Sequence, residues 1–423
     1  MIMKILLKNC KIIQESSSHH NKKMDILINK GKIEKIERNI SDSKAKIVES
    51  KNLHCSAGWI DIGTHLGEPG FEQRETFESL SNAAIKGGYT DIVTMPDSAP
   101  SIQTKAQIKS LIENGKANNI NIFPLAALSW DMKGEDISEF HDLSKGGAIG
   151  FTDGLHPIKK GGLLLRALQY IKGTDAIIVH HPYDPSLSND NLIHEGEVSI
   201  TLGLKGSPDI AEEIMIFRDL KLLEYSNSKL CIHLLNSKKG LKLIKDGKKS
   251  NDALYSGVSY LNIVATHEDL SQFDANFKVI PILRNKKDKK ALINGLLEDT
   301  IDYIASNHKP LEVEKKELEF MYADHGAIGL ETCFAAVNTM TEGKIPLSTL
   351  IKKLTSDPRK VYNLDEEVIE ENNQAKLTIF DPTISWKYTA SDIASLSRNT
   401  PFKDQTFTGK ALGVITNGQL ILN

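Results

Sequence analysis

The sequence predicts an α/β fold: a (β/α)8 barrel of the TIM type with a small β-sandwich domain made from both termini. Three observations predict it. Strand patterns occupy both ends of the 423-residue chain, apolar runs alternate with helical patterns between them, and polar residues follow several of those runs. A chain of this length exceeds one compact core. We therefore predict a β-sandwich from residues 1–55 and 366–423, and a barrel over residues 56–365.

The two ends of the chain alternate polar and apolar residues, as half-buried strands do. The strand patterns are KILLKNCKII, MDILINKGKIEKIE and AKIVES near the start, and AKLTIFDP and ALGVITNGQLILN near the end. A turn at Asn29 to Gly31 and another at Asn417 and Gly418 predict two hairpins. Two strand-rich ends around a different middle predict that the termini meet in one small domain.

The middle of the chain contains short apolar runs that are typical of buried parallel strands. These runs are TDIVTMP, INIFPLAAL, AIGFTD, AIIVHH and KLCIHLL. Helical patterns lie between them, most clearly in SPDIAEEIMIFRDLKLLEYS. There Ser207 can cap the helix and Pro208 suits its first position, and Ile210, Ile214 and Phe217 trace one apolar face.

The composition is that of an ordinary globular protein, with 40% hydrophobic and 25% charged residues and a mean hydropathy of −0.27. The net charge of −3 argues against nucleic acid or an anionic membrane as a partner. No apolar stretch approaches the about 18–20 residues that span a bilayer. The four cysteines form no CxxC pair, which predicts reduced thiols and a cytoplasmic location.

Candidate site residues follow the predicted strands, at the end where barrel enzymes carry their chemistry. They are His65, Asp97, Asp153, His180, His181 and His233. In DIGTHLGEPG, a regular strand would project Asp61, Gly63 and His65 to one face. Metal-dependent hydrolases often place two histidines at that spacing, and here one of the two positions is glycine.

These segments resemble the dihydroorotases of the amidohydrolase superfamily. The family pattern Asp-x-His-x-His-x-Arg-Glu-Pro-Gly is similar to DIGTHLGEPG, and the resemblance continues in order through TMPDSAP, NFKVIPILR, HGAIGLET and TSDPRKVYNL. It implies a metal-dependent barrel with a β-sandwich from both termini. It also implies reversible cyclisation of carbamoyl aspartate to dihydroorotate in pyrimidine synthesis, with two zinc ions and an aspartate that carries the proton.

Several positions depart from what the resemblance implies. Gly63 replaces the first histidine of the pair, and Gly67 replaces an arginine that holds the substrate carboxylate. Asp97 stands for a substrate-binding asparagine. Asn307 occupies the general-base position, and Leu311 replaces the last histidine of the same motif. Because an amide is not a base at neutral pH, we predict no catalytic residue.

Three residues are the remaining metal candidates: His65, Asp153 and His181. His180 is an alternate register for His181. The next family histidine falls on Leu234 without a gap, and His233 fits after a local shift. The predicted substrate pocket contains Gly63, Gly67, Asp97 and His308.

We therefore expect a dihydroorotase homologue with degraded metal and substrate residues, catalytically inactive and scaffold-like, with zinc absent or substoichiometric. The alternative is an active zinc-dependent dihydroorotase or related cyclic amidohydrolase with a single-metal site built from His65, Asp153 and His181. A small-molecule sensor that uses the old pocket is a third class. Family analogy suggests aspartate transcarbamoylase as a partner, and we expect a homo-oligomer without nucleic acid or membrane.

Overall fold

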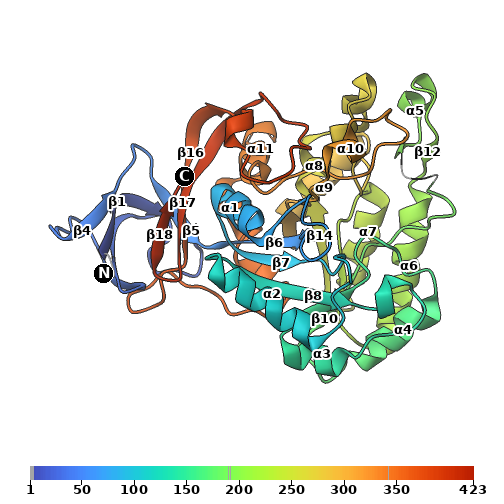
Figure 1. Ribbon diagram of the computed structural model, residues 1–423, viewed down its shortest axis with the longest axis horizontal. Coiled ribbons are helices and arrows are strands. Elements are labelled where there is room, and N and C mark those ends of the chain that lie inside the picture. The colour runs from blue at the N-terminus through green and yellow to red at the C-terminus, as the bar shows by residue number, and fades with distance from the viewer. Residues whose placement is uncertain (1–3, 189, 191, 342) are drawn as a thin grey trace.

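The computed structural model describes residues 4–188, 190, 192–341 and 343–423 (Figure 1). It contains a small sheet on one side and a barrel surrounded by helices on the other. The blue beginning and the red end of the ribbon lie together in the small sheet (Figure 1). The predicted α/β barrel with a β domain from both termini is confirmed. Residues 1–3, which open the predicted sheet domain, lie outside the described residues.

The small sheet has eight strands in the order β18-β17-β16-β5-β1-β2-β3, with β4 paired to β1. Its strands are β1 (Lys4–Ile12), β2 (Lys23–Asn29), β3 (Lys32–Glu37), β4 (Ala45–Val48), β5 (His54–Ala57), β16 (Leu377–Lys387), β17 (Thr406–Thr416) and β18 (Gln419–Leu422). Both predicted hairpins are present, between β2 and β3 and between β17 and β18. Strand β5 pairs with β1 on one side and β16 on the other, so it joins the two termini.

Eight parallel strands form the barrel, in the order β15-β14-β13-β10-β9-β8-β7-β6. They are β6 (Trp59–Thr64), β7 (Tyr89–Thr94), β8 (Asn121–Ala127), β9 (Gly150–Thr152), β10 (Ile177–His180), β13 (Leu230–Ile232), β14 (Leu254–Ser259) and β15 (Tyr303–Ala305). Asp61 of β6 joins the two ends of this order, because its carboxylate accepts hydrogen bonds from the backbone N and Oγ of Ser306, both at 2.7 Å. The backbone N of His65 also donates to the carbonyl of His308 at 3.0 Å.

Helices surround these strands (Figure 1). The helices are α1 (Phe77–Gly87), α2 (Lys105–Ala117), α3 (Phe140–Gly146), α4 (Gly161–Tyr170), α5 (Glu197–Thr201), α6 (Ile210–Ser226), α7 (Lys238–Gly247), α8 (Tyr260–Val264), α9 (Lys286–Leu297), α10 (Val313–Lys316), α11 (Cys333–Met340), α12 (Leu347–Lys352) and α13 (Ser356–Val361). Short 3₁₀ turns span Trp130–Met132, His267–Gln272, Ala275–Phe277 and Ala390–Asp392. A two-stranded ribbon joins β11 (Ile193–His194) to β12 (Gly206–Ser207).

Helix α6 differs from its prediction in two ways. It begins after Asp209, and Ser207, the predicted cap, belongs to β12. The predicted apolar face of Ile210, Ile214 and Phe217 is exposed to solvent. The opposite face is buried instead, and it carries Ala211, Glu212, Met215, Ile216, Asp219 and Leu223.

The carboxylates on the buried face explain this orientation. Asp219 accepts a hydrogen bond from His180 Nδ1 at 2.6 Å, and Glu212 accepts one from the backbone N of Asn236 at 2.7 Å. Buried carboxylates require such partners. The inward side of α6 is therefore selected by its hydrogen bonds as well as by its apolar residues.

Two other predictions from composition can be compared with the structure. All four cysteines are buried and free, as predicted. Within the described residues, no helix is both long and apolar enough to cross a membrane. The domain limits near residues 55 and 366 stay a prediction.

Candidate functional site

The strand β6 carries a bulge where the sequence predicts regular alternation. The pairing of β6 with β7 shifts register between Ile62 and Thr64, and Gly63 has a φ of +85°, in the left-handed region. Left-handed backbone is adopted most readily by glycine, which has no Cβ. Because of the bulge, Asp61 bonds Thr64 and Ser306 while His65 turns to a different partner. The prediction that Asp61, Gly63 and His65 share one face is therefore wrong.

Three imidazoles at the strand ends are anchored in the same way. His65 Nδ1 donates to Asp97 Oδ2 at 2.5 Å, and His181 Nδ1 donates to the carbonyl oxygen of His233 at 3.0 Å. His233 Nδ1 shares a hydrogen bond with the Tyr303 hydroxyl at 2.8 Å. The Nε2 atoms of His65 and His233 are buried and have no partner among the described residues. An imidazole held at Nδ1 with Nε2 free is the usual arrangement of a metal-binding histidine.

Burial keeps two of these rings neutral. It lowers the pKa of His181 to about 4, with the neighbouring His180 acting in the same direction. It also lowers the pKa of His233 well below the ordinary value, helped by the charges of His181 and His65. Neutral imidazole is the form that coordinates metal ions. These two side chains are therefore in the ligating form at pH 7.

The charge on Asp97 stabilises the orientation of His65. Burial by itself raises the pKa of this carboxyl, but the charge and the hydrogen bond of His65 outweigh it and hold the pKa at about 2. Asp97 is consequently ionised at neutral pH and accepts the Nδ1 proton. The Asp97 carboxylate therefore orients His65 by a hydrogen bond. The resemblance implied instead an asparagine that contacts substrate at this position.

The structure distinguishes between the two histidine registers that the sequence leaves open. His180 uses both ring nitrogens, since Nδ1 donates to Asp219 and Nε2 accepts from the backbone N of Ile158 at 2.9 Å. His181 keeps Nε2 free within the described part of the chain. After β13, Leu234 is packed in the barrel core with a φ of +58°. His233 is therefore the residue that presents an imidazole here.

Two glycines replace polar side chains of the family pattern, and both sit where a side chain would collide. A Cβ on Gly63 would lie 2.6 Å from His233 Nε2. A Cβ on Gly67 would lie 2.5 Å from the carbonyl oxygens of Phe71 and Glu75. These distances are well below van der Waals contact. The backbone at both positions thus has room only for glycine. An arginine side chain cannot be accommodated at position 67 in this geometry.

Asp153 and Asn307 are both engaged by nearby backbone. The Asp153 carboxylate accepts from the backbone N of Ser129 at 2.9 Å and from its Oγ at 2.5 Å, and burial raises the pKa of this carboxyl. Asn307 Nδ2 donates to the carbonyl of Ile280 at 2.9 Å. An ionised Asp153 remains a possible oxygen ligand if it leaves Ser129, whereas Asn307 offers a neutral amide.

His308 and Leu311 are structural in this geometry. His308 is fully buried, its Nε2 donates to Glu75 Oε2 at 3.2 Å, and its Nδ1 accepts from the backbone N of Gly329 at 3.2 Å. Both ring nitrogens are thus in use, which leaves neither for a substrate. Leu311 is buried in the same region.

A further acidic and histidine cluster lies above the barrel, and the sequence reasoning missed it. Among the described residues, only His194, Asp209 and Asp288 bring three candidate ligand atoms within 4.8 Å of one another. Arg284 already supplies a cation there, with Nη1 2.6 Å from Asp209 Oδ1 and 3.2 Å from His194 Nδ1. This cluster is therefore a charge-paired group rather than a metal cage. Asp209 precedes α6 and Asp288 lies in the first turn of α9, so no local sequence signal could have pointed to the cluster.

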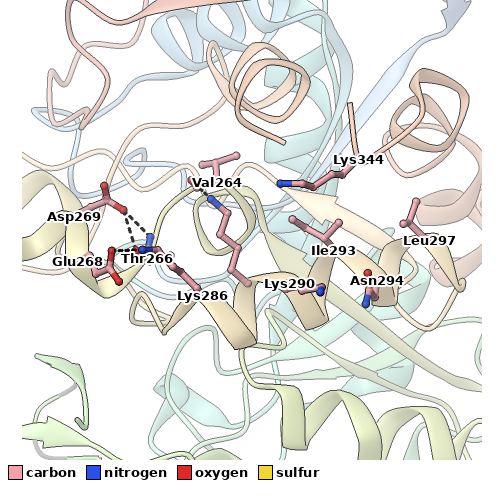
Figure 2. A pocket seen from close by; sticks show the side chains of 11 residues that line it. Val264, Thr266, Glu268, Asp269, Lys286, Lys290, Ile293, Asn294, Leu297 and Lys344 are labelled. Carbon is pink, nitrogen blue, oxygen red and sulfur yellow. Dashed lines mark hydrogen bonds and ion pairs between the residues drawn. The ribbon is translucent and has the colours of Figure 1, made fainter. Parts of the chain in front are cut away.

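The cavities of the molecule differ greatly in size. A cavity at the mouth of the barrel, beside His181, Glu212, Asn236 and Arg284, has a volume of only about 20 Å³. That is room for about one water molecule. A larger hollow, about 860 Å³, lies outside the barrel against α9 and is lined in part by lysines, with Lys286 paired to Glu268 at 2.7 Å (Figure 2). None of the predicted site residues lines that hollow.

Solved structures resemble this fold over its full length. The L-hydantoinase (dihydropyrimidinase) from Arthrobacter aurescens matches with a TM-score of 0.85 and 22% identity, covering 100% of this chain and 96% of that one. A D-hydantoinase crystal structure matches with a TM-score of 0.83 and 20% identity, covering 100% and 95%. At these identities the likeness establishes the barrel fold and its terminal sheet.

Sequence comparisons identify the family. A family model described as dihydro-orotase-like matches residues 55–240. A dihydroorotase from Syntrophus aciditrophicus (strain SB) is 34% identical over 423 residues, with 99% of both chains covered. A dihydroorotase from Ruminiclostridium cellulolyticum (strain ATCC 35319 / DSM 5812 / JCM 6584 / H10) is 33% identical over 419 residues, with 98% of both covered. The chain belongs to the dihydroorotase family.

Proposed function

We propose that this protein is a metal-dependent dihydroorotase of pyrimidine synthesis, or a closely related cyclic-amide hydrolase, that works with one bound cation. Its relatives named dihydroorotase match it from end to end. The observation that carries the proposal is the set of three imidazoles, His65, His181 and His233, each anchored at Nδ1 with no partner for Nε2 among the described residues. This extends the predicted set of His65, Asp153 and His181 by one residue.

The donor set fits one zinc ion better than two. Zinc needs three protein ligands and an open position for water to act as a hydrolytic centre. The three imidazoles supply those ligands, and Asp153 is a fourth candidate if it leaves Ser129. Among the described residues, the three Nε2 atoms do not all lie within 4.8 Å of one another, so binding requires side-chain movements. Gly63 and Asn307 replace two ligands that a second cation would need.

When bound, zinc would polarise the substrate carbonyl and lower the pKa of a water molecule. The chain's own residues define the remaining chemistry. Asp97 holds His65 in place, and the Asn307 side chain can accept a hydrogen bond through Oδ1 but cannot take a proton. The proposal therefore predicts slow turnover. With no guanidinium at Gly67, it also predicts weak binding of the substrate carboxylate.

Metal analysis is the first test. Purified protein is stripped with a chelator, loaded with zinc, desalted and measured by elemental analysis. We expect about one zinc per chain, since three histidines make one site. His181→Ala and His233→Ala should lose the zinc, whereas His141→Ala, an exposed histidine on α3, should keep it. Two ions per chain would contradict the single-cation site, and no zinc in the wild-type protein would contradict the proposal entirely.

Turnover is measured next, with dihydroorotate, carbamoyl aspartate and hydantoin. The decisive variant is Asn307→Asp, which restores a carboxylate at the base position. A positioned general base contributes about 10²–10⁴-fold to the rate, so kcat/KM should rise by about 10²-fold or more. Asn307→Ala is the matched control and should show no gain. Equal rates for Asn307→Asp and Asn307→Ala would refute the role assigned to this position.

A second candidate function is a non-catalytic family member that supports the assembly of aspartate transcarbamoylase, the partner suggested by family resemblance. The small cavity at the barrel mouth and the amide at position 307 favour it. In this case neither the wild-type protein nor Asn307→Asp turns over any of the three substrates, even with zinc bound. Co-sedimentation with aspartate transcarbamoylase from the same cell would then be the positive test.

A further inference from the structure

A tyrosine in the barrel interior reaches the ring of His233 from two strands away. Tyr303 of β15 is fully buried, and its hydroxyl lies 2.8 Å from His233 Nδ1. The two rings lie nearly parallel, with centroids 6.1 Å apart and planes inclined by 26°. Strand β14 lies between β15 and β13, the strand that His233 directly follows. A side chain from β14 at this level would stand between the two rings.

Gly257 of β14 provides the space for this contact. It pairs directly with Tyr303 in the sheet. On its other side, the pairing of Ile232 with Ser256 brings His233 to the same level. A Cβ on Gly257 would lie 2.1 Å from both Cε2 and Cζ of the Tyr303 ring, far below van der Waals contact. The tyrosine ring therefore occupies the space that a side chain at position 257 would need.

The Tyr303 hydroxyl has few polar neighbours. Tyr303 and Cys231 belong to the apolar cluster that fills the barrel interior, together with Val93 and Val179. Cys231 Sγ lies 3.4 Å from the hydroxyl, and a thiol is only a weak donor and a weak acceptor. The hydroxyl is the hydrogen-bond partner of His233 Nδ1 among the described residues. Tyr303 thus determines whether that ring nitrogen carries a hydrogen.

Two directions of hydrogen bonding fit these distances. In the first, His233 Nδ1–H donates to the Tyr303 oxygen, and the hydroxyl donates to Cys231 Sγ. In the second, the thiol donates to the hydroxyl and the hydroxyl donates to Nδ1, so His233 carries its ring hydrogen on Nε2. That nitrogen is buried and has no partner among the described residues, so the second direction buries an N–H donor without an acceptor. The first direction leaves a lone pair on Nε2, which is what a metal ion binds.

We propose that Tyr303 is a positioning residue, which holds His233 in the Nδ1–H form and keeps the Nε2 lone pair available to a cation. The cation in this statement rests on the proposed function, whereas the position of the ring hydrogen is a property of the zinc-free chain as well. The hydrogen-bond partners behind a metal-binding histidine fix which nitrogen binds the metal, and losing one typically weakens metal binding about 10–100-fold. The candidate site thereby extends from the barrel mouth into the barrel interior.

The ring hydrogen is measured by NMR of the full chain, zinc-free, at neutral pH and with nitrogen-15 in its histidines. The signals of His233 are those that disappear in His233→Ala. The wild-type protein should carry the hydrogen on Nδ1, and Tyr303→Phe, which removes one oxygen atom, should carry it mainly on Nε2. Tyr89→Phe is the matched control, because Tyr89 is also fully buried and its hydroxyl has no hydrogen-bond partner among the described residues. It should leave the His233 signals unchanged.

Zinc affinity is the second measurement, by competition with a chelator. Tyr303→Phe should raise the Kd for zinc about 10–100-fold, whereas Tyr89→Phe should keep the wild-type value. Circular dichroism should show both variants folded, since each loses only a hydroxyl group.

Three results would overturn the proposal: a wild-type His233 with its hydrogen on Nε2, a Tyr303→Phe protein with unchanged His233 signals, or a Tyr303→Phe protein with the wild-type Kd. A wild-type chain that binds no zinc would instead refute the proposed function. The NMR measurement on the zinc-free chain would still decide the role of Tyr303, so the two failures are distinguishable.

Discussion

Gly63 offers the most direct test of how the barrel mouth is built. Replacing it with alanine adds one Cβ, and that atom would lie 2.6 Å from His233 Nε2 and 3.0 Å from Met95 Cε. The φ of +85° is a second source of cost, because left-handed backbone costs a residue with a Cβ about 1–2 kcal/mol. Overpacking costs about 1–3 kcal/mol more. We expect Gly63→Ala to lower the free energy of unfolding by about 2–5 kcal/mol.

A second glycine separates these two costs. Gly173 has a φ of +87°, and a Cβ there meets no described atom within 4 Å. Gly173→Ala should therefore lower the free energy of unfolding by the backbone term alone, about 1–2 kcal/mol. Urea unfolding of both variants, at an unchanged m-value, gives the two free energies. The difference between them measures the collision with His233.

The collision can also be removed from the other side. In a double variant, His233→Ala takes away the ring that the new Cβ would strike, so the double variant should lose less stability than the sum of the two single variants. A Gly63→Ala protein as stable as Gly173→Ala would refute this reasoning. Strict additivity in the double variant would also refute it.

Other predictions concern buried charge, pH and zinc. Asp91→Asn should lower the free energy of unfolding by about 3–5 kcal/mol, because the buried guanidinium of Arg359, 2.5 Å away, then lacks its carboxylate partner. The control variant Asp131→Asn, at an exposed position, should leave the urea midpoint unchanged. The pKa of His181 is about 4 in the folded protein, so between about pH 6.5 and 4 this histidine is protonated in the unfolded chain but not in the folded one. The free energy of unfolding should therefore fall over that range, by on the order of 3 kcal/mol. Replacing this histidine with asparagine should flatten that dependence in a urea titration. Free zinc at 100 times its Kd should stabilise the wild-type protein and His141→Ala by about 2.7 kcal/mol, but not His181→Ala. A wild-type protein whose melting temperature does not change when zinc is added would contradict the proposed zinc site.

The fold could be predicted largely because its signals are local. The hairpins rest on turns such as Asn417 and Gly418, where both residues have positive φ. Strands β7, β8 and β10 lie in apolar runs long enough to recognise, and the short strand β9 lies within the longer run AIGFTD. Strand β15 covers only Tyr303–Ala305, and its place in the barrel depends on the distant Asp61. A three-residue strand that is completed by a contact far along the chain leaves no periodic pattern to read.

The site was harder to predict because its deciding features are not local. The choice between His180 and His181 depends on Asp219 of α6, which occupies His180 and leaves His181 available. The apolar pattern of α6 pointed to the wrong face, since the helix also needs to bury that carboxylate. Hydrogen-bond requirements of this kind outweigh periodicity, and a single sequence does not display them.

The missing histidine at position 63 and the retained one at position 233 are parts of one arrangement. The bulge in β6 places the backbone of Gly63 against the His233 ring, so the space that a second imidazole would need is already filled. A side chain alone cannot reverse this, because histidine at a φ of +85° would strain the backbone as well as strike the ring. Asn307 differs in this respect, since its side chain already reaches the barrel mouth and needs only an oxygen in place of its amide nitrogen. A paired-cation centre would therefore require a different backbone conformation in the β6 bulge. Restoring a proton-accepting carboxylate at position 307 would require only the single substitution Asn307→Asp. That asymmetry supports the proposed single-cation site over a paired-cation centre.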